Sequence, residues 1–211
     1  MPIRWSDRRL CLTDNTPTTR FDRHYIYHPA WAARVLAQLR PAVHIDVSSK
    51  LYFSAIVSAF LPIKFLDYRP ARLSLSGLEC GQGDLLSLPF ADASVASLSC
   101  MHTVEHIGLG RYGDRLDPDG DIKSIAELKR VLAPAGSLLF VVPIGEPRIQ
   151  FNAHRIYAYH QIRAYFNDLE LKEFALVPDK EDQGGLIIDA PESMADSQTY
   201  GCGCFWFQKP Q

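Results

Sequence analysis

The stretch DIKSIAELKRVLAPAGSLLFVVPIG (121–145) places an amphipathic helix directly before a short apolar run. Apolar residues recur at helical spacing over 121–132 and predict a helix with one buried stripe. The stripe consists of Ile122, Ile125, Leu128, Val131 and Leu132. Pro134 and Gly136 are expected to end this helix. The segment 137–145 is apolar throughout, which is typical of a parallel strand covered on both faces.

The same alternation of helix and strand continues on both sides of this unit. Further helices are predicted over 28–40, 50–61 and 157–168, and strands over 41–49, 62–70, 94–102, 169–178 and 201–209, with one more strand ending near Asp84. Right-handed crossovers between such strands favour a parallel sheet. The last two strands have no obvious helix between them, which indicates an antiparallel end. We therefore expect an α/β fold with a mostly parallel seven-stranded sheet, an antiparallel end strand and helices on both faces.

Length and composition restrict the class of protein. The chain has 211 residues, of which 47% are hydrophobic and 22% charged, as in an ordinary soluble globular protein. We expect a polar N-terminal arm over 1–22 and a single domain over 23–211. The net charge of -2 disfavours a nucleic-acid partner, and no apolar run is long enough to span a membrane. Dispersed cysteines and the lack of a signal-like start predict a cytoplasmic location; the oligomeric state stays open.

Acidic residues stand at the ends of three predicted strands: Asp46, Asp67 and Asp84. Ligands of α/β sheets bind beyond the carboxyl ends of the strands. A carboxylate after the second strand can bind both hydroxyls of a ribose, and Asp67 lies 21 positions after Asp46 (67 − 46). Asp84 can accept from an adenine amino group while the backbone N–H of Leu85 faces a ring nitrogen. The alternative is that these loops are simply acidic and solvated.

Two segments carry a resemblance to a known superfamily. GDLLSLPFADASVASLSCMHTVEHI (83–107) and ELKRVLAPAGSLLFVVP (127–143) resemble the small-molecule, type-11-like branch of the class I S-adenosylmethionine-dependent methyltransferases. The resemblance covers about 41–145 and implies a Rossmann-like methyltransferase fold with S-adenosylmethionine as cofactor. The cofactor contacts that it implies are Asp46, Ser48, Asp67, Asp84, Leu85 and Met101. EHIGLGRYGD, LDPDGD and FNAHRIY further resemble a bacterial family catalogued as a domain of unknown function.

The first motif departs from the superfamily pattern. Glycines usually follow the first strand and admit the cofactor close to the backbone. Here DVSSKLY (46–52) places Ser48, Lys50 and Tyr52 at the three glycine positions. Cofactor binding is therefore either rebuilt or lost.

Methyl transfer is an in-line displacement, so the protein chiefly aligns the reactants, and an oxygen acceptor also needs a base. His102 ends the fourth strand and is the catalytic candidate; the alternative is a residue that caps the turn. The expected substrate contacts are His106, Arg111, Tyr112, Asp114, Asn152, His154 and Arg155, with His24, Tyr25 and His28 as possible additions to the rim. These residue types favour a small, polar, sugar-like acceptor.

Three motifs raise the question of a metal. H-T-V-E-H (102–106) has the spacing of a zinc peptidase, but it requires a helix, and Gly108 and Gly110 follow at once. Cys202 and Cys204 form a C-x-C pair without a second pair close in sequence. D-P-D-G-D (117–121) lacks the closing glutamate of a calcium loop. We therefore predict no metal.

Two functions from different classes remain. The first is an S-adenosylmethionine-dependent methyltransferase that acts on a small polar molecule. The alternative is a non-catalytic binding or scaffold protein of the same fold with a degenerate cofactor loop. Cofactor binding separates the two.

Overall fold

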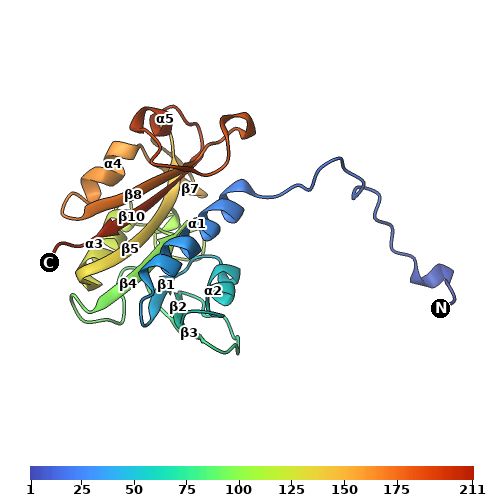
Figure 1. Cartoon of the computed structure of the whole chain (residues 1–211), viewed down its shortest axis with the longest axis horizontal. Coiled ribbons are helices and arrows are strands. Elements are labelled where there is room, and N and C mark those ends of the chain that lie inside the picture. The colour runs from blue at the N-terminus through green and yellow to red at the C-terminus, as the bar shows by residue number, and fades with distance from the viewer.

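One mixed sheet of eight strands organises the chain in the computed structural model, which describes residues 1–211 (Figure 1). In sheet order, the strands are β3 (Leu78–Gln82), β2 (Ile63–Asp67), β1 (His44–Val47), β4 (Val95–Met101), β5 (Leu132–Ile144), β10 (Gly201–Gln208), β8 (Glu170–Val177) and β9 (Ile187–Ile188). Strands β1 to β5 pair in parallel, and β10 lies antiparallel between β5 and β8. The predicted α/β fold with an antiparallel end is confirmed; the short β9 adds one strand to the expected seven.

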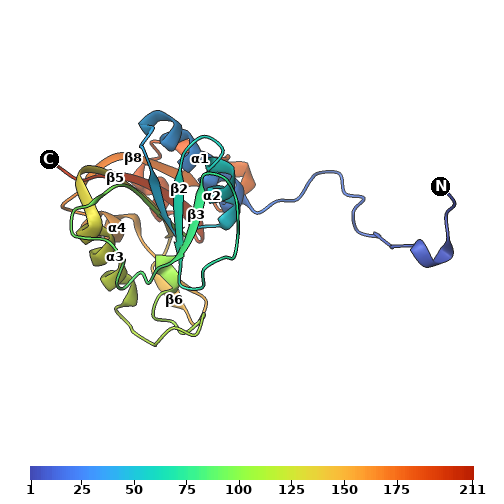
Figure 2. The ribbon, with the colours of Figure 1, turned by 90° about the horizontal axis from the view of Figure 1, so that it is seen from below.

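Helices cover both faces of the sheet, as predicted (Figure 2). The helices are α1 (Arg23–Leu39), α2 (Leu51–Val57), α3 (Gly120–Val131), α4 (Tyr159–Tyr165) and α5 (Glu192–Asp196). The buried residues of α1 and α2 belong to one hydrophobic core, and those of α3 and α4 to the other. The two cores stabilise the sheet from opposite sides.

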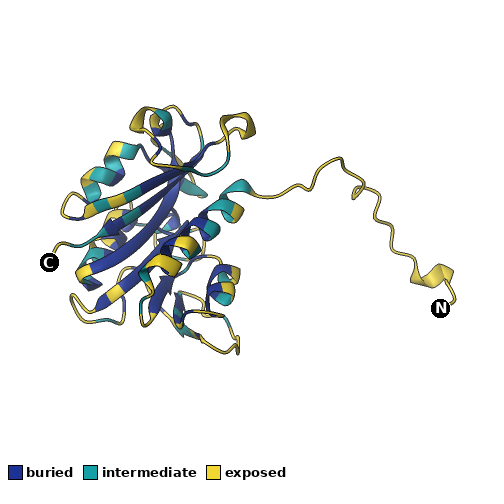
Figure 3. Cartoon of the chain, viewed as in Figure 1, coloured by how far each residue is buried: buried dark blue, intermediate teal, exposed yellow.

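Strand β5 shows why the sheet is apolar on both faces (Figure 3). Leu138, Phe140 and Val142 pack into the core of α3 and α4, while Leu139 and Val141 pack into the core of α1 and α2. The strand begins at Leu132, so Pro134 and Gly136 lie within it rather than between helix and strand. These residues remain in an extended strand because the backbone of Lys209, directly after β10, forms hydrogen bonds with the backbones of Ala135 and Gly136.

Helix α1 begins five residues earlier than the predicted start at residue 28 (28 − 23). The carboxylate of Asp22 accepts a hydrogen bond from the backbone N–H of Tyr25 and caps the new start. Pro29 therefore lies inside the helix, where it cannot donate to the carbonyl of Tyr25. The hydroxyl of Tyr52 donates to that carbonyl instead, at 2.7 Å, which satisfies the group that proline leaves free.

Several segments lie outside the regular α/β pattern. Residues 1–22 are exposed and extend away from the body, with one short turn, η1 (Trp5–Asp7) (Figure 1). A hairpin of β6 (Arg148–Gln150) and β7 (His154–Ile156) follows β5, and two short turns, η2 (Val104–His106) and η3 (Glu181–Gln183), occur in loops. None of the helices combines the length and hydropathy that crossing a bilayer requires.

Candidate functional site

Two adjoining cavities lie at the carboxyl ends of the parallel strands. The first cavity, about 640 Å³, lies between the ends of β1 to β4 and the loop 107–118, and its walls include Asp67, Asp84 and Leu85. The second cavity, about 410 Å³, is lined by residues of α1, of the β6–β7 hairpin and of the segment before β10. The residues that line both cavities are Ser48, His102, His106 and Tyr112. The two cavities therefore share a wall at the end of β4.

Asp67 and Asp84 face the first cavity from neighbouring strands, as the sequence predicts. Asp67 is the last residue of β2, and its Oδ1 accepts a hydrogen bond from the N–H of Arg69 at 2.8 Å. Asp84 follows β3, and its Oδ1 accepts from the N–H of Leu86 at 2.9 Å. These turns orient both carboxylates and leave the second oxygen of each for a ligand in the cavity.

Asp46 does not line either cavity, in contrast to its expected place at the end of a strand. It lies within β1, is fully buried and accepts hydrogen bonds from the hydroxyls of Ser54 and Ser99. The hydroxyl of Ser99 also contacts the ring of the buried His44. Burial raises the pKa of Asp46 and lowers the pKa of His44 to about 3. This network supports β1 from within the sheet, and the role of His44 was not foreseen from the sequence.

The three residues that replace the glycines have separate orientations. Ser48 has a φ of 58° and lines both cavities. The ammonium of Lys50 lies 4.4 Å from the ring centroid of Tyr25 and reaches only the second cavity. Tyr52 turns toward α1 and lines neither cavity. The two bulky side chains thus lie outside the first cavity.

The loop 107–118 forms the outer wall of the first cavity. Asp114 holds it together, because its two oxygens accept from the backbone N–H groups of Gly108, Gly110 and Tyr112 at 2.8, 3.3 and 3.1 Å. Partial burial acts in the opposite direction, but these bonds keep the pKa of Asp114 below its ordinary value. Asp114 was predicted to contact substrate; its carboxylate is instead occupied by the loop's own backbone.

Tyr112 is held between two cations at the shared wall. The guanidinium of Arg69 lies 4.9 Å and that of Arg111 5.2 Å from its ring centroid. Arg111 also donates to the carbonyl of Ala153 at 2.9 Å and so ties the loop to the β6–β7 hairpin. Tyr112 and Arg111 therefore occupy the region that the sequence predicts for substrate contacts, and Arg111 lines the second cavity.

The hairpin brings only part of its predicted motif to the site. His154 lines the second cavity. Arg155 is buried behind it, donates to the carbonyls of Ile107 and Pro118 at 2.7 and 3.1 Å, and lies 3.5 Å from Asp121. Asn152 is exposed at the hairpin's tip and lines neither cavity. Arg155 thus supports the loop rather than the rim.

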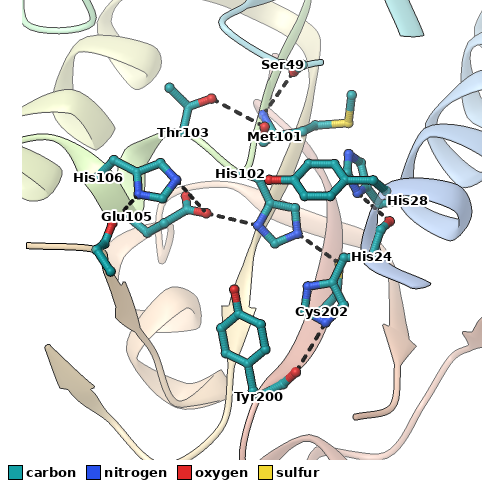
Figure 4. A network of polar contacts seen from close by, with 12 residues as sticks. His24, His28, Ser49, Met101, His102, Thr103, Glu105, His106, Tyr200 and Cys202 are labelled. Atoms are coloured by element: carbon teal, nitrogen blue, oxygen red, sulfur yellow. Dashed lines mark hydrogen bonds and ion pairs between the residues drawn. The ribbon is translucent and has the colours of Figure 1, made fainter. Parts of the chain in front are cut away.

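The H-T-V-E-H segment forms a strand end followed by the three-residue turn η2, which does not suit a zinc-peptidase helix. Glu105 lies between the two imidazoles (Figure 4): its Oε1 is 2.9 Å from Nδ1 of His102 and 3.8 Å from Nε2 of His106. Nδ1 of His106 donates to the carbonyl of Ala153 at 2.7 Å. Oε2 of Glu105 is buried without a hydrogen-bond partner, and Glu105 lines the second cavity.

His102 lies at the shared wall as predicted, but both of its ring nitrogens contact protein. Nδ1 faces Glu105, and Nε2 lies 3.4 Å from Sγ of Cys202. Burial disfavours the charged ring, but its contacts with Cys202 and Glu105 outweigh burial and raise the pKa of His102. Burial also raises the pKa of Cys202, so the thiol stays protonated and Glu105 is the partner that charges His102. A charged His102 is poorly suited to act as a free base.

Aromatic hydroxyls complete the second cavity. Tyr25 enters from α1, as the sequence indicates, and Tyr200 enters from the segment before β10. Burial raises the pKa of both hydroxyls, that of Tyr200 to about 12. Both remain neutral donors and acceptors at ordinary pH. Tyr200 was missed because only the position of β10 beside β5 brings it here.

The other predicted residues lie nearby. Leu85 is buried in the wall of the first cavity. Met101 lines the second cavity and not the first. His24 and His28 line neither cavity, in contrast to their expected place on the rim; they pack against the ring of His102, with centroid distances of 5.3 and 5.0 Å.

Comparison with known sequences gives one partial match. A family model described as Caenorhabditis protein of unknown function, DUF268, matches residues 91–175. This agrees with the expected resemblance to a family of unknown function, although the description does not name a bacterial family. No curated protein matches the chain.

Solved structures match most of the chain. One is a complex between the Haloferax volcanii Trm112 methyltransferase activator and a candidate methyltransferase, with 19% identity, a TM-score of 0.60 and 90% coverage of both chains. Another is 1,6-didemethyltoxoflavin-N1-methyltransferase of Burkholderia thailandensis with bound S-adenosylhomocysteine: 12% identity, TM-score 0.60, covering 88% of this chain and 79% of that one. A third is the [4+2]-cyclase SpnF: 13% identity, TM-score 0.54, covering 85% and 81%. These similarities show that the chain has the Rossmann-like methyltransferase fold.

Proposed function

We propose that the protein is an S-adenosylmethionine-dependent methyltransferase that acts on a small polar acceptor. The observation that carries the proposal is the pair of cavities that meet at Ser48, His102, His106 and Tyr112. Their place beyond the carboxyl ends of parallel strands is where this class of fold binds ligands. When bound, S-adenosylmethionine supplies a methyl group on a positively charged sulfur.

The first cavity suits the cofactor. We propose that Asp67 binds the ribose hydroxyls and that Asp84, with the N–H of Leu85, binds the adenine edge, because all three residues line this cavity and each carboxylate has only one oxygen bonded to its own turn. The volume of about 640 Å³ is within the usual range for small-molecule sites. Ser48 adopts the left-handed backbone that a glycine would favour, and Lys50 and Tyr52 point elsewhere.

The second cavity suits a polar acceptor, including a sugar-like or phosphorylated one. Lys50 and Arg111 offer positive charge, and Tyr25 and Tyr200 offer neutral hydroxyls. Oε2 of Glu105 is buried without a hydrogen-bond partner in a residue that lines this cavity, and we propose that it accepts a hydrogen bond from an acceptor hydroxyl or amine. The pKa of Glu105 is lowered because its contacts with the two histidines outweigh burial, so it orients the acceptor rather than carrying its proton. We propose that the His102–Glu105 pair, and not His102 alone, aligns the acceptor.

Further details belong to the same proposal. The bacterial placement within a family of unknown function rests on the motifs EHIGLGRYGD, LDPDGD and FNAHRIY. A cytoplasmic location and the absence of nucleic-acid and membrane partners rest on the composition and charge.

Isothermal titration calorimetry with S-adenosylhomocysteine tests the proposal. We expect one site per chain, with affinity reduced at least about tenfold by Asp67→Ala and by Asp84→Ala, because each change removes charge-assisted hydrogen bonds. Asp196→Ala, at an exposed position of α5, is the matched control and should leave the affinity unchanged. Absence of binding to the folded chain would contradict the proposal.

The alternative is a non-catalytic binding or scaffold protein. The loss of all three glycines in DVSSKLY favours it, and the cyclase SpnF illustrates that this fold also serves other chemistry. It predicts that the chain folds normally and binds no S-adenosylhomocysteine, which the same calorimetry would show.

A further inference from the structure

Behind the second cavity, three elements bring together nitrogen and sulfur atoms that the proposed methyl transfer does not use. His24 comes from α1, His102 from the end of β4 and Cys202 from β10. One possible ligand atom from each lies within 4.8 Å of the other two. We propose that His24, His102 and Cys202 form a zinc site, which is independent of whether the chain binds S-adenosylmethionine.

The separation of the donor atoms is close to what zinc requires. Nε2 of His102 lies 3.4 Å from Sγ of Cys202. Tetrahedral zinc, with bonds of roughly 2.1 Å to nitrogen and 2.3 Å to sulfur, places these two atoms about 3.6 Å apart. The pair therefore already has the spacing of one edge of a zinc tetrahedron.

The hydrogen bonds of the rings prepare the remaining nitrogens as ligands. Nδ1–H of His102 donates to Glu105, and Nε2–H of His24 donates to the carbonyl of Tyr200 at 3.2 Å (Figure 4). Each acceptor fixes one proton on its ring. Nδ1 of His24 therefore keeps a lone pair for a metal, whereas zinc would displace the proton that the charged His102 carries on Nε2, as it would displace the proton of the Cys202 thiol. Zinc-binding histidines typically donate their second N–H to a carboxylate or a backbone carbonyl in this way.

His28 provides an independent indication. Its Nδ1 donates to the carbonyl of His24 at 2.7 Å, while its Nε2 is buried without a hydrogen-bond partner. An unpaired buried nitrogen is costly unless something binds it. The ring lies edge-on against His102 but outside the group of three donors, so we propose that His28 supplies the fourth ligand after its side chain moves toward them.

Charge and donor type favour zinc. Imidazole with thiolate is a borderline-soft set that suits zinc and excludes calcium and magnesium. Zinc with the Cys202 thiolate would carry one positive charge, which the carboxylate of Glu105 beside His102 would neutralise. Cys204, whose Sγ is 3.9 Å from that of Cys202, is the nearest further sulfur. Zinc would join α1 to β10 and fix the ring of His102 at the shared wall of the cavities.

Cobalt and zinc binding to the full chain, freed of metal by a chelator and kept in a non-chelating reductant, tests the site. We expect one Co²⁺ per chain, a thiolate-to-cobalt charge-transfer band and the strong visible absorption of tetrahedral cobalt, with displacement by one equivalent of Zn²⁺. Cys202→Ser should abolish the charge-transfer band. His24→Gln, and His28→Phe, which keeps an aromatic ring, should each weaken zinc binding at least about tenfold.

Cys11→Ser, in the exposed arm, is the matched control and should keep both the band and the affinity. Circular dichroism verifies the fold of each variant, and His24→Gln at the partly exposed start of α1 tests the site even if Cys202→Ser does not fold. Absence of the charge-transfer band in the folded wild type, or zinc affinity unchanged in His24→Gln, would overturn the proposal. Calorimetry with S-adenosylhomocysteine on the metal-free chain tests cofactor binding separately. A failure to bind zinc can therefore be distinguished from a failure of the methyltransferase proposal.

Discussion

The two cavities differ in how far apart their residues lie in the chain. Every residue that lines the first cavity falls between positions 48 and 123, mostly in loops that directly follow β1 to β4. The second cavity collects residues from position 25 to position 200, on α1, the hairpin and the segment before β10. The residues of the first cavity can therefore be recognised one by one as residues that follow strands. The residues of the second cavity are distant in sequence and meet only because of the order of the strands in the sheet.

Arg155 links the two regions, because it belongs to the hairpin but holds the loop of the first cavity, and Arg111 links them from the loop side. Arg155→Met should lower the free energy of unfolding by about 3 kcal/mol, since it removes the buried cation beside Asp121, which keeps only the hydrogen bond from Tyr157, and the donor to two carbonyls. It should also weaken S-adenosylhomocysteine binding. Denaturant unfolding measures the first effect, with the exposed Arg72→Met as control. A loss below about 1 kcal/mol would show that Arg155 does not couple the two regions.

Two glycines of the loop test how closely the first cavity's wall is packed. Gly108 and Gly113 both have positive φ, 80° and 84°, but a Cβ on Gly108 would collide with the carbonyl of Asp117, whereas one on Gly113 meets no atom within 4 Å. We expect Gly108→Ala to cost about 2 to 3 kcal/mol and Gly113→Ala about 1 kcal/mol of unfolding free energy. Equal costs in thermal unfolding would show that the loop moves freely and does not form a fixed wall.

The buried network beneath both cavities should make stability depend on pH. His44 has a pKa of about 3 when folded, against about 6.5 in the unfolded chain. Between these values the unfolded state binds a proton that the folded state does not, so stability falls as the pH is lowered, by about 1.4 kcal/mol per pH unit. His24 and His28, whose pKa values burial also lowers, add to the same slope. His44→Gln should therefore reduce the slope between pH 6 and 4 by about 1.4 kcal/mol per pH unit, and the exposed His160→Gln should leave it unchanged. Unchanged slopes in urea unfolding would contradict the buried, neutral state of His44.

Tyr52 tests the contact between the altered DVSSKLY segment and α1. Tyr52→Phe should cost about 1 kcal/mol, because it removes the donor to the carbonyl of Tyr25. In a Pro29→Ala background the loss should be smaller, since the alanine N–H can serve the same carbonyl. Equal losses in the two backgrounds would show that Tyr52 does not compensate for the proline.

The sequence was informative where a feature is local. The acids Asp67 and Asp84 line the first cavity as predicted, because they follow directly on strands. A helix and a strand also follow one another over 121–144 as the hydrophobic period predicts, but Ile122 is exposed rather than part of the buried stripe, and the strand begins earlier than expected, at Leu132. Asp46 was expected in the ligand site but lies buried in β1, where the hydroxyls of Ser54 and Ser99 donate hydrogen bonds to its carboxylate. Helix α1 starts earlier than predicted because the hydroxyl of Tyr52, distant in sequence, donates to the carbonyl of Tyr25 that Pro29 cannot reach.

The sequence could not predict the clustering of His24, His102 and Cys202. These residues lie on three separate elements, and only the insertion of β10 between β5 and β8 brings the cysteine to the end of β4. The spacing of H-T-V-E-H suits zinc only on a helix, and this segment is a strand end followed by a short turn. Tertiary contact assembles a different set of donors around the same His102.

A crystal structure with S-adenosylhomocysteine is the most direct test of the two-cavity site. We predict density in the first cavity, with the ribose on Asp67, the adenine beside Asp84 and Leu85, and the sulfur at the wall formed by Ser48, His102, His106 and Tyr112. The second cavity should remain open beside the sulfur. A first cavity closed by protein side chains, or ligand density only elsewhere on the molecule, would contradict the proposed methyltransferase function.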